Sequence, residues 1–263
     1  MEHLSPPPPQ TIPRREAAAA KLGVNLSPAL PLSPSPTPPH DAEELWAQLA
    51  TRGGIELQDS QRQLLHRYLD LLIAGNQKMN LTRIVDPAAA GLLHVGDSLT
   101  LLPLLPKGPH RLVDVGSGGG LPGMVLAIAR PEVKVTLLEA TRKKADFLKS
   151  TADELGLGNV TVIPMRAEEV VRDKPTGGGM RGPFDVAVAR AVALLPQLAE
   201  WLLPLLKPGG VMLAMKGPKV AEEIPATSKI LRRLCGGKIS QIPAGLPGVE
   251  GHLIVSIPKL RGR

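Results

Sequence analysis

The segment 111–123, RLVDVGSGGGLPG, decides the fold of this chain. Its apolar residues Leu112, Val113 and Val115 predict a short buried strand. The glycines that follow predict a turn whose backbone can adopt positive φ angles and approach a ligand closely. Pro122 fits the first position of a helix, which apolar residues at helical spacing continue. A strand, a glycine turn and a helix start in this order predict a nucleotide-type pocket, with free backbone N–H groups facing an anionic or zwitterionic ligand.

Two ligands suit such a turn. Gly118, Gly120 and Gly123 match the dinucleotide fingerprint, whereas Asp114 begins an acid-x-Gly-x-Gly-x-Gly order similar to that of methyltransferases that use S-adenosyl-L-methionine (SAM). The glycine spacing alone does not choose between NAD and SAM, and a plain strand-to-helix turn is a third interpretation. A carboxylate here would repel a pyrophosphate but attract the ammonium and sulfonium groups of SAM. Asp114 therefore favours SAM.

The composition indicates a basic protein without a membrane-spanning segment. The 263 residues have room for one large domain and an appendage. A net charge of +7 suits a polyanionic partner, with nucleic acid the first candidate and an anionic membrane surface the second. No apolar run approaches the roughly 20 residues that span a bilayer, and no secretory leader is apparent.

Cysteine and aromatic residues are scarce. The single cysteine, Cys235, excludes an internal disulfide, makes a cysteine-rich zinc site implausible and fits a reducing compartment, so no metal is expected. Aromatic residues make up only 2% of the chain, too few for a sheet that stacks RNA bases on aromatic rings. Basic side chains are therefore expected to make most contacts to nucleic acid.

Three regions follow one another along the chain. Residues 1–40 are crowded with proline and are expected to be disordered, apart from one or two helical turns at 17–22. They are interpreted as a passive extension, with a ligand for proline-binding domains and an organelle targeting peptide as the functional alternatives. Residues 41–109 predict a small helical subdomain with helices at 44–49, 58–73, 87–95 and 98–105. Residues 110–263 predict the main domain.

Strands and helices alternate after the glycine turn. The expected strands cover 133–138, 160–163, 184–189, 211–215, 238–242 and 252–257, and the expected helices cover 142–155, 195–206 and 219–234. A flexible glycine loop is expected at 177–179. This alternation predicts an α/β, Rossmann-like fold with a mainly parallel sheet flanked by helices, and with ligands at the carboxyl ends of the strands.

Polar residues stand where three of these strands end. Glu139 lies about 20 residues past the glycine turn, where an acid can accept hydrogen bonds from the ribose of SAM or NAD. Ala167 and Glu168 follow the third strand, near the expected place of an adenine; an ordinary surface acid is the alternative for Glu168. Arg190 ends the fourth strand, where it is expected to contact guanine O6 or a phosphate, or to form a structural ion pair.

The residues around Arg190 narrow the chemistry. The segment 188–191, VARA, lacks the Asn/Asp-Pro-Pro-aromatic motif of enzymes that methylate exocyclic amines. Methylation at cytosine C5 needs a thiolate, and Cys235 is remote from any strand end. A ring nitrogen with its own lone pair, such as guanine N7, needs neither a base nor a nucleophile, only positioning and electrostatics.

Other polar residues allow more than one interpretation. His94, Asp97 and Ser98 suggest a hydrolase triad, but no nucleophile elbow accompanies them. The alternatives are that Asp97 or Ser98 caps the next helix or that these residues contact the substrate. Some of the basic residues are expected to contact phosphates, the others forming a solvated face. These basic residues are Arg142, Lys143, Lys144, Lys149, Lys216, Lys219, Lys229, Arg232 and Arg233.

Taken together, these motifs resemble the bacterial ribosomal RNA small-subunit methyltransferase G family, also called glucose-inhibited division protein B, over residues 41 to 258. The resemblance rests on Asn80-Leu81-Thr82, His94-x-x-Asp97-Ser98, the turn from Asp114 to Gly123, Arg190-Ala191 and Met215-Lys216-Gly217. It implies SAM-dependent methylation of guanine N7 in 16S ribosomal RNA, on a class I methyltransferase fold. The implied partner is small-subunit ribosomal RNA or the assembled subunit, for a cytoplasmic monomer without a membrane partner.

The resemblance also implies site residues. SAM is expected against Asp114, Gly116, Gly118, Leu121, Glu139, Ala140, Thr141, Ala167, Glu168 and Arg190, and the substrate is expected to be positioned by Arg190, Lys216 and His94. The chain departs from the family pattern at two places. Gly75 stands where a tryptophan is usual, and the proline-rich extension is additional. If that extension is a targeting peptide, a plastid location is expected. An NAD-dependent oxidoreductase, which lacks an evident hydride-transfer acid or base here, and a non-catalytic RNA-binding or assembly factor are the alternatives.

Overall fold

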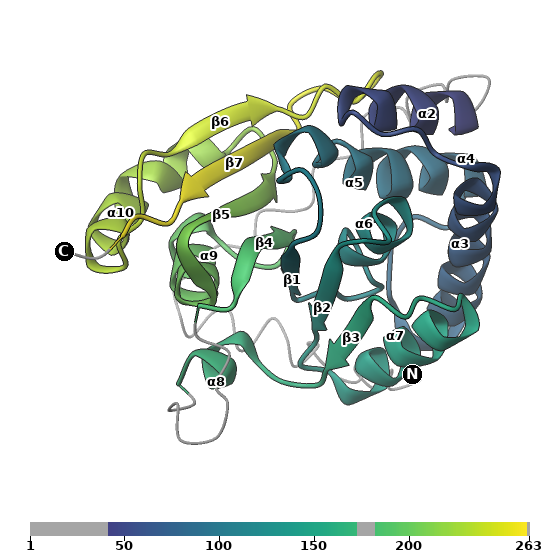
Figure 1. The fold of residues 1–263 in the computed structure, drawn as a ribbon, viewed down its shortest axis with the longest axis horizontal. Helices are drawn as coiled ribbons and strands as arrows, with labels where there is room; N and C mark the ends of the chain where they lie inside the picture. Colours follow the sequence, from purple (N-terminus) through teal and green to yellow (C-terminus); the bar gives the residue numbers. More distant parts are fainter. Residues whose placement is uncertain (1–41, 173–181, 262–263) are drawn as a thin grey trace, which may run out of the picture. The chain divides into compact units, whose positions relative to one another are not determined.

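The computed structural model describes residues 42–172 and 182–261, and a seven-stranded sheet runs through this part of the chain. The strands are β1 (Arg111–Val115), β2 (Lys134–Leu138), β3 (Val160–Ile163), β4 (Phe184–Arg190), β5 (Leu206–Lys216), β6 (Ser240–Pro243) and β7 (Leu253–Pro258). Their order is β3-β2-β1-β4-β5-β7-β6 (Figure 1). The pairs from β3 to β5 are parallel, and β7 runs antiparallel to both β5 and β6. The predicted mainly parallel α/β sheet is confirmed.

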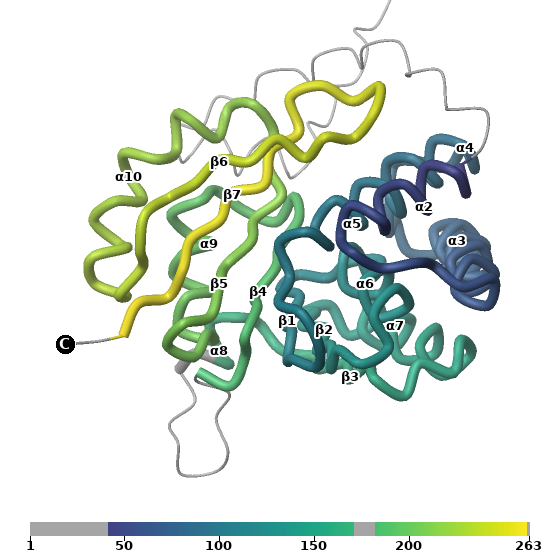
Figure 2. The backbone as a smooth tube through the Cα atoms, turned by 45° about the horizontal axis from the view of Figure 1, so that its top comes forward, coloured from purple at the N-terminus to yellow at the C-terminus, as the bar shows by residue number. Residues whose placement is uncertain are grey.

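Two apolar cores cover the two faces of the sheet, because successive strand residues point to opposite sides. Leu112 belongs to one core and Val113 to the other. The first core lies under α6 (Gly123–Ala129) and α7 (Arg142–Glu154), and the second under α8 (Ala167–Arg172), α9 (Leu195–Leu202) and α10 (Val220–Arg233). Figure 2 shows α6 and α7 on one side of the strands and α9 and α10 on the other.

The N-terminal helices join the first core. They are α2 (Ala42–Arg52), α3 (Asp59–Met79), α4 (Pro87–Ala90) and α5 (Asp97–Leu99), with a π-helix at Gly91–Gly96 and a 3-10 turn at Leu102–Leu104. The fully buried Tyr68 on α3 donates a hydrogen bond from its hydroxyl to the carbonyl of Gly119 at 3.0 Å. This bond fastens α3 to the glycine turn. A domain boundary at residue 109 stays a prediction.

Several predicted elements differ from the structure. The helix expected at 58–73 continues to Met79, α8 was not expected, and β5 begins at Leu206 rather than at 211. The helices expected at 87–95 and 98–105 are not separated at Gly96, which keeps helical backbone angles of φ −55° and ψ −50°. Gly96 packs against Leu246 and Leu45, where an added Cβ would lie 3.2 Å and 3.4 Å from their methyl groups.

Some expectations concern residues outside the described ranges. These are the disordered extension at 1–40, the helical turns at 17–22 and the glycine loop at 177–179. Within residues 42–172 and 182–261, none of the helices is both long enough and apolar enough to cross a bilayer.

Candidate cofactor and substrate site

Two adjoining cavities open at the carboxyl ends of the parallel strands, beside β1, where the strand order reverses. This is where open α/β sheets bind ligands. The first cavity has a volume of about 490 Å³. Eight of the ten residues predicted to bind the cofactor line it: Gly116, Gly118, Leu121, Glu139, Ala140, Ala167, Glu168 and Arg190. The structure therefore brings together residues that lie up to 74 positions apart in the sequence.

Asp114 and Thr141 are the two predicted cofactor residues outside this lining. Asp114 is fully buried beneath the turn, where its Oδ2 accepts a hydrogen bond from the N–H of Gly123 at 2.9 Å. Its Oδ1 is buried without a hydrogen-bond partner among the described residues. Burial raises the pKa of Asp114 to about 7, against the lowering effect of the Gly123 hydrogen bond. The carboxyl group thus binds the N–H at the start of α6. Its contact with a cofactor remains a prediction.

The expectation of free N–H groups in the glycine turn is wrong for most of the turn. The N–H groups of Gly116 and Ser117 donate to the carbonyl of Leu138 at the end of β2. Those of Gly118, Gly120, Leu121 and Gly123 also have acceptors inside the protein. The reason is that the turn closes on itself and on β2. A turn whose donors are already used is poorly suited to a diphosphate, which such glycine loops bind through free N–H groups.

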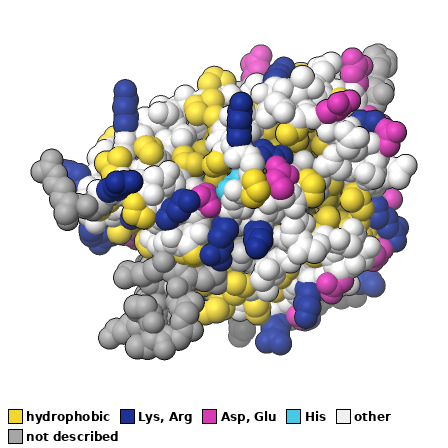
Figure 3. Space-filling model, in the orientation of Figure 1, with side chains coloured by type: hydrophobic (Ala, Val, Ile, Leu, Met, Phe, Trp, Pro, Cys, Tyr) yellow, Lys and Arg dark blue, Asp and Glu magenta, His cyan; other side chains and the backbone are white. Residues whose placement is uncertain are grey.

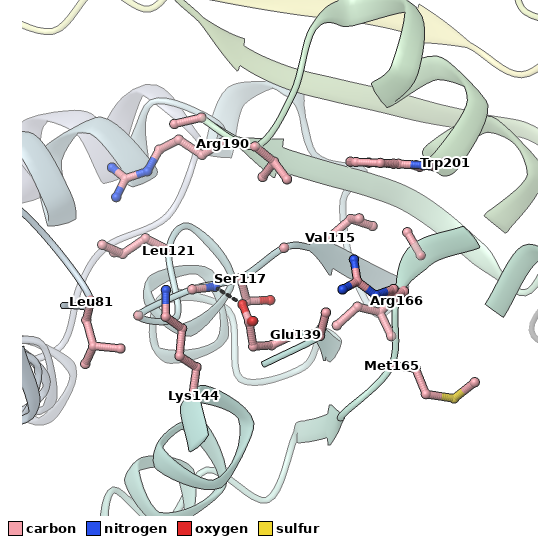
Figure 4. A pocket seen from close by; sticks show the side chains of 18 of the residues that line it. Leu81, Val115, Ser117, Leu121, Glu139, Lys144, Met165, Arg166, Arg190 and Trp201 are labelled. Atoms are coloured by element: carbon pink, nitrogen blue, oxygen red, sulfur yellow. Dashed lines mark hydrogen bonds between the residues drawn. The ribbon is translucent and has the colours of Figure 1, made fainter. Parts of the chain in front are cut away.

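Glu139 closes the floor of the first cavity (Figure 4). Its Oε2 accepts from the N–H of Gly118 at 2.9 Å, and its Oε1 accepts from the N–H of Thr141 at 2.7 Å. The side chain of Lys144 extends from α7 toward the turn, and Arg166 lies on the side of the cavity that follows β3. The cavity therefore carries both acidic and basic groups, as a ligand with a cationic and a carboxylate part requires.

The second cavity, of about 420 Å³, shares Arg190 and Ala191 with the first. The Nη1 atom of Arg190 donates to the carbonyl of Leu93 at 2.9 Å and lies 3.3 Å from Asp97 Oδ2. The other oxygen of Asp97 lies 3.2 Å from Nδ1 of His252. Arg190 therefore forms an ion pair, and it still lines both cavities.

His94 also lines the second cavity. Its Nε2 lies 2.8 Å from the hydroxyl of Thr82, and its Nδ1 lies 3.5 Å from Nη2 of Arg190. Burial, and next the neighbouring guanidinium of Arg190, lower the pKa of His94 to about 4. The imidazole is therefore neutral at pH 7, with Thr82 as its polar partner.

The hydrolase and capping interpretations of Asp97 and Ser98 are both wrong. The hydroxyl of Ser98 donates to the backbone carbonyl of His94 at 2.6 Å, and not to an imidazole. Asp97 is not a helix cap, because the residue before it, Gly96, already has helical backbone angles. Its carboxylate forms an ion pair with Arg190. No Ser-His-Asp relay exists in this cluster.

Lys216 lines the second cavity, but its ammonium group has partners within the protein. It donates to the carbonyl of Ala193 at 3.0 Å and lies 2.9 Å from Oε2 of Glu223. The same Glu223 oxygen accepts a hydrogen bond from the N–H of Leu195. Lys216 therefore holds the loop that follows β4, and its predicted role in positioning the substrate would act through that loop.

Several lining residues were not predicted from the sequence. They are Leu81, Thr82, Met165, Arg166, Ala191, Val192 and Trp201 in the first cavity, and His252 among those of the second. Arg166 and Val192 stand directly beside the predicted strand ends, a signal that was present in the sequence. His252 carries no such signal, because it reaches the site only through the reversed strand β7.

The basic residues separate into two groups. Lys144 lines the first cavity, while Arg142, Lys143 and Lys149 are exposed on α7. Lys219, Lys229, Arg232 and Arg233 are exposed on or beside α10, where Arg233 pairs with Glu200. Figure 3 shows Lys and Arg side chains spread over one face of the protein, with a histidine visible near its middle.

These observations define a class. The reversed strand β7 between β5 and β6 departs from the 3-2-1-4-5-6 order of dinucleotide-binding sheets. The turn lacks the free donors that a diphosphate needs, and an acid ends β2. The fold and the site are those of a Rossmann-like, class I SAM-dependent methyltransferase domain.

Comparison with known proteins gives the family. The sequence model described as rRNA small subunit methyltransferase G matches residues 61–249. Ribosomal RNA small subunit methyltransferase G of Sorangium cellulosum is 46% identical over 78% of this chain and 82% of its own. The protein of the same name from Chloroflexus aggregans is 41% identical over 84% of this chain and 91% of its own. The chain belongs to the rRNA small subunit methyltransferase G family, which confirms the resemblance seen in the sequence.

Among solved structures, the chain is similar to the 16S rRNA (adenine(1408)-N(1))-methyltransferase from Catenulisporales acidiphilia. The TM-score is 0.45 at 16% identity, over 60% of this chain and 88% of that one.

Proposed function

We propose that the protein transfers a methyl group from SAM to guanine N7 in 16S ribosomal RNA. The observation that carries this proposal is the pair of adjoining cavities that share Arg190 and Ala191 at the carboxyl ends of the strands. Two ligands held in such cavities meet at their common wall, as transfer of a group between them requires. The names of the relatives, all rRNA methyltransferases, support the choice of ribosomal RNA.

The first cavity fits SAM. Gly116 has a φ of +72°, and a Cβ there would lie 2.8 Å from a methyl group of Val192, so only glycine keeps this wall open. Glu139 would accept hydrogen bonds from the ribose, and Ala167 and Glu168 would border the adenine. When bound, SAM supplies an electrophilic methyl group on a sulfonium. The buried carboxyl of Asp114 would favour that positive charge through the turn, to the extent that the group is ionised.

The second cavity is suited to hold a base without a general base catalyst. Guanine N7 carries its own lone pair, so no proton has to be removed before it attacks a methyl group. His94 is neutral, with its Nε2 beside Thr82, and Arg190 carries N–H donors that would meet guanine O6 or a phosphate. The protein's contribution would be the placement of N7 and the exclusion of water, which are positioning effects.

Titration and transfer assays test this proposal together. The full-length protein is titrated with SAM and with NAD, and it is then incubated with methyl-labelled SAM and small subunits from cells lacking this methylation. We expect SAM binding and label in the 16S RNA. Tight NAD binding without SAM binding would favour an oxidoreductase. SAM binding with no transfer to naked RNA or to subunits would favour an assembly factor.

The remaining expectations extend the proposal. We propose a monomer that acts on the small subunit in the cytoplasm without a membrane partner, and in a plastid if residues 1–40 are a targeting peptide. We also propose that residues 41–109 act as a helical subdomain beside the methyltransferase domain at 110–263. Sedimentation and fractionation of the tagged full-length protein test these points.

A further inference from the structure

Large apolar side chains are exposed at few places, and three of the four residues concerned lie within two positions of a residue that lines a cavity. Across residues 42–172 and 182–261, the exposed large apolar side chains are Val85, Val192, Leu194 and Leu260. Val85 follows Ile84, which lines the second cavity, and Val192 lines the first. Leu194 is 64% exposed and lies two residues beyond Val192. Single exposed apolar residues are ordinary on a protein surface, but a group of them at a ligand site is not.

The loop that carries Val192 and Leu194 is held firmly. It leaves β4 through Ala191, whose φ of +54° is unfavourable for any residue with a Cβ. Lys216 fixes its middle at the carbonyl of Ala193, and Glu223 fixes its end at the N–H of Leu195. Lys216 and Glu223 are themselves an ion pair, with side chains only 12% and 15% exposed. A loop restrained in this way presents its apolar side chains in a fixed place.

The surroundings of this loop fit a nucleic acid. Arg190, Lys144 and Arg166 line the cavities, and Lys219 is exposed beside the end of β5. Basic groups around an apolar tip are complementary to phosphates around stacked bases. Among the described residues, the aromatic rings in the cavity walls are those of Trp201 in the first cavity and of His94 and His252 in the second. Aliphatic groups beside the cavities would add contact with base faces.

We infer that Leu194, supported by Val192, is an aliphatic wedge that enters the RNA stack beside the target guanosine. This inference rests on the proposed function. A guanosine that enters the second cavity leaves its neighbours, and the gap in the stack costs free energy. An apolar side chain that fills the gap lowers this cost, as apolar wedges do when they separate base steps. The wedge thus belongs to RNA binding and not to SAM binding.

Substitutions at Leu194 test the wedge, with Leu260 as the matched control. Leu260 is 50% exposed and follows β7 at the opposite end of the strands from the cavities. Leu194 makes no side-chain hydrogen bond at the start of α9, so its replacement removes no cap. For each variant, kcat and KM are measured with undermethylated small subunits, and the Kd for SAM is measured by calorimetry.

We expect Leu194→Ala to raise KM for subunits by roughly 10-fold, the loss expected when most of the buried apolar area of one leucine is removed. The Kd for SAM stays unchanged, Leu194→Met keeps most of the affinity for subunits, and Leu260→Ala behaves like the unaltered protein. Unchanged kcat and KM in Leu194→Ala would overturn the wedge. An unchanged KM for subunits in Leu194→Lys would also overturn it, because lysine places a charged group where the wedge needs an apolar one. Absence of transfer by the unaltered protein would overturn the proposed function, and the wedge with it.

Discussion

The carboxylate of Glu139 accepts a hydrogen bond of 2.9 Å from the N–H of Gly118, so the end of β2 is joined directly to the glycine turn after β1. Its second oxygen accepts from Thr141 at 2.7 Å. The carboxylate, only 7% exposed, therefore has a fixed position at the floor of the first cavity. Ribose hydroxyls placed there would meet an acceptor that is already oriented.

Glu139→Gln is expected to weaken SAM binding. An amide replaces one acceptor oxygen with an NH2 group, which would face a backbone N–H or a ribose hydroxyl donor. The loss of one hydrogen bond to a charged group, about 1.5–3 kcal/mol, corresponds to a Kd for SAM that is roughly 10- to 100-fold higher. Calorimetric titration checks this, with the exposed Glu222→Gln on α10 as control. An unchanged Kd would remove Glu139 from the cofactor site.

Asp114→Asn is expected to change how stability depends on pH. Because the pKa of Asp114 is raised to about 7, the folded protein holds this proton more tightly than the unfolded chain does. The stability contributed by the protonated group is then present at low pH and is lost as pH rises toward 7. Thermal melts from pH 5 to pH 8 should show the Tm of the unaltered protein falling by several degrees more than that of the variant. Parallel curves would show that Asp114 is an ordinary ionised carboxylate.

Gly75→Ala is expected to destabilise the protein. A Cβ at Gly75 would lie 2.5 Å from Cε2 of Phe147, so the Phe147 ring occupies space that a side chain would need. Overpacking of this kind costs about 1–3 kcal/mol, which the better helix propensity of alanine offsets by roughly 0.5–1 kcal/mol. Urea unfolding measures the net loss. Gly158→Ala is the control, because no atom lies within 4 Å of its added Cβ.

Gly75 and Phe147 share one space, since the Phe147 ring on α7 lies where a Cβ at Gly75 would stand. Phe147→Leu should therefore relieve part of the loss caused by Gly75→Ala, so the double variant is less destabilised than the sum of the two single variants. Additive losses would mean that the two residues do not share the space.

His252→Gln is expected to matter most at low pH. The hydrogen bond with Asp97 raises the pKa of His252, so the protonated imidazole is favoured in the folded protein. This contribution is fully present below the ordinary histidine pKa and is lost as pH rises through the raised value. The half-exposed pair contributes little, so we expect a Tm lower by on the order of 1–3 °C at pH 5.5 and no difference at pH 8.5. An equal difference at both values would exclude the ion pair as the cause.

Local patterns were sufficient for the glycine turn, Glu139 and most strands, since each depends on residues close together in the sequence. The gap expected between the helices at 87–95 and 98–105 is absent, since Gly96 keeps helical backbone angles. The second cavity could not be predicted from local sequence patterns, because its residues are far apart in the sequence. Asp97 meets Arg190 across 93 residues and His252 across 155, and only the strand order brings them together.

Nucleoside mass spectrometry tests the central claim most directly. Small subunits from cells that lack this methylation are incubated with the full-length protein and methyl-labelled SAM, and the 16S RNA is then digested to nucleosides. The account predicts that the label appears in N7-methylguanosine. Label on another atom or base, or an unlabelled RNA in the presence of folded protein that binds SAM, would contradict it.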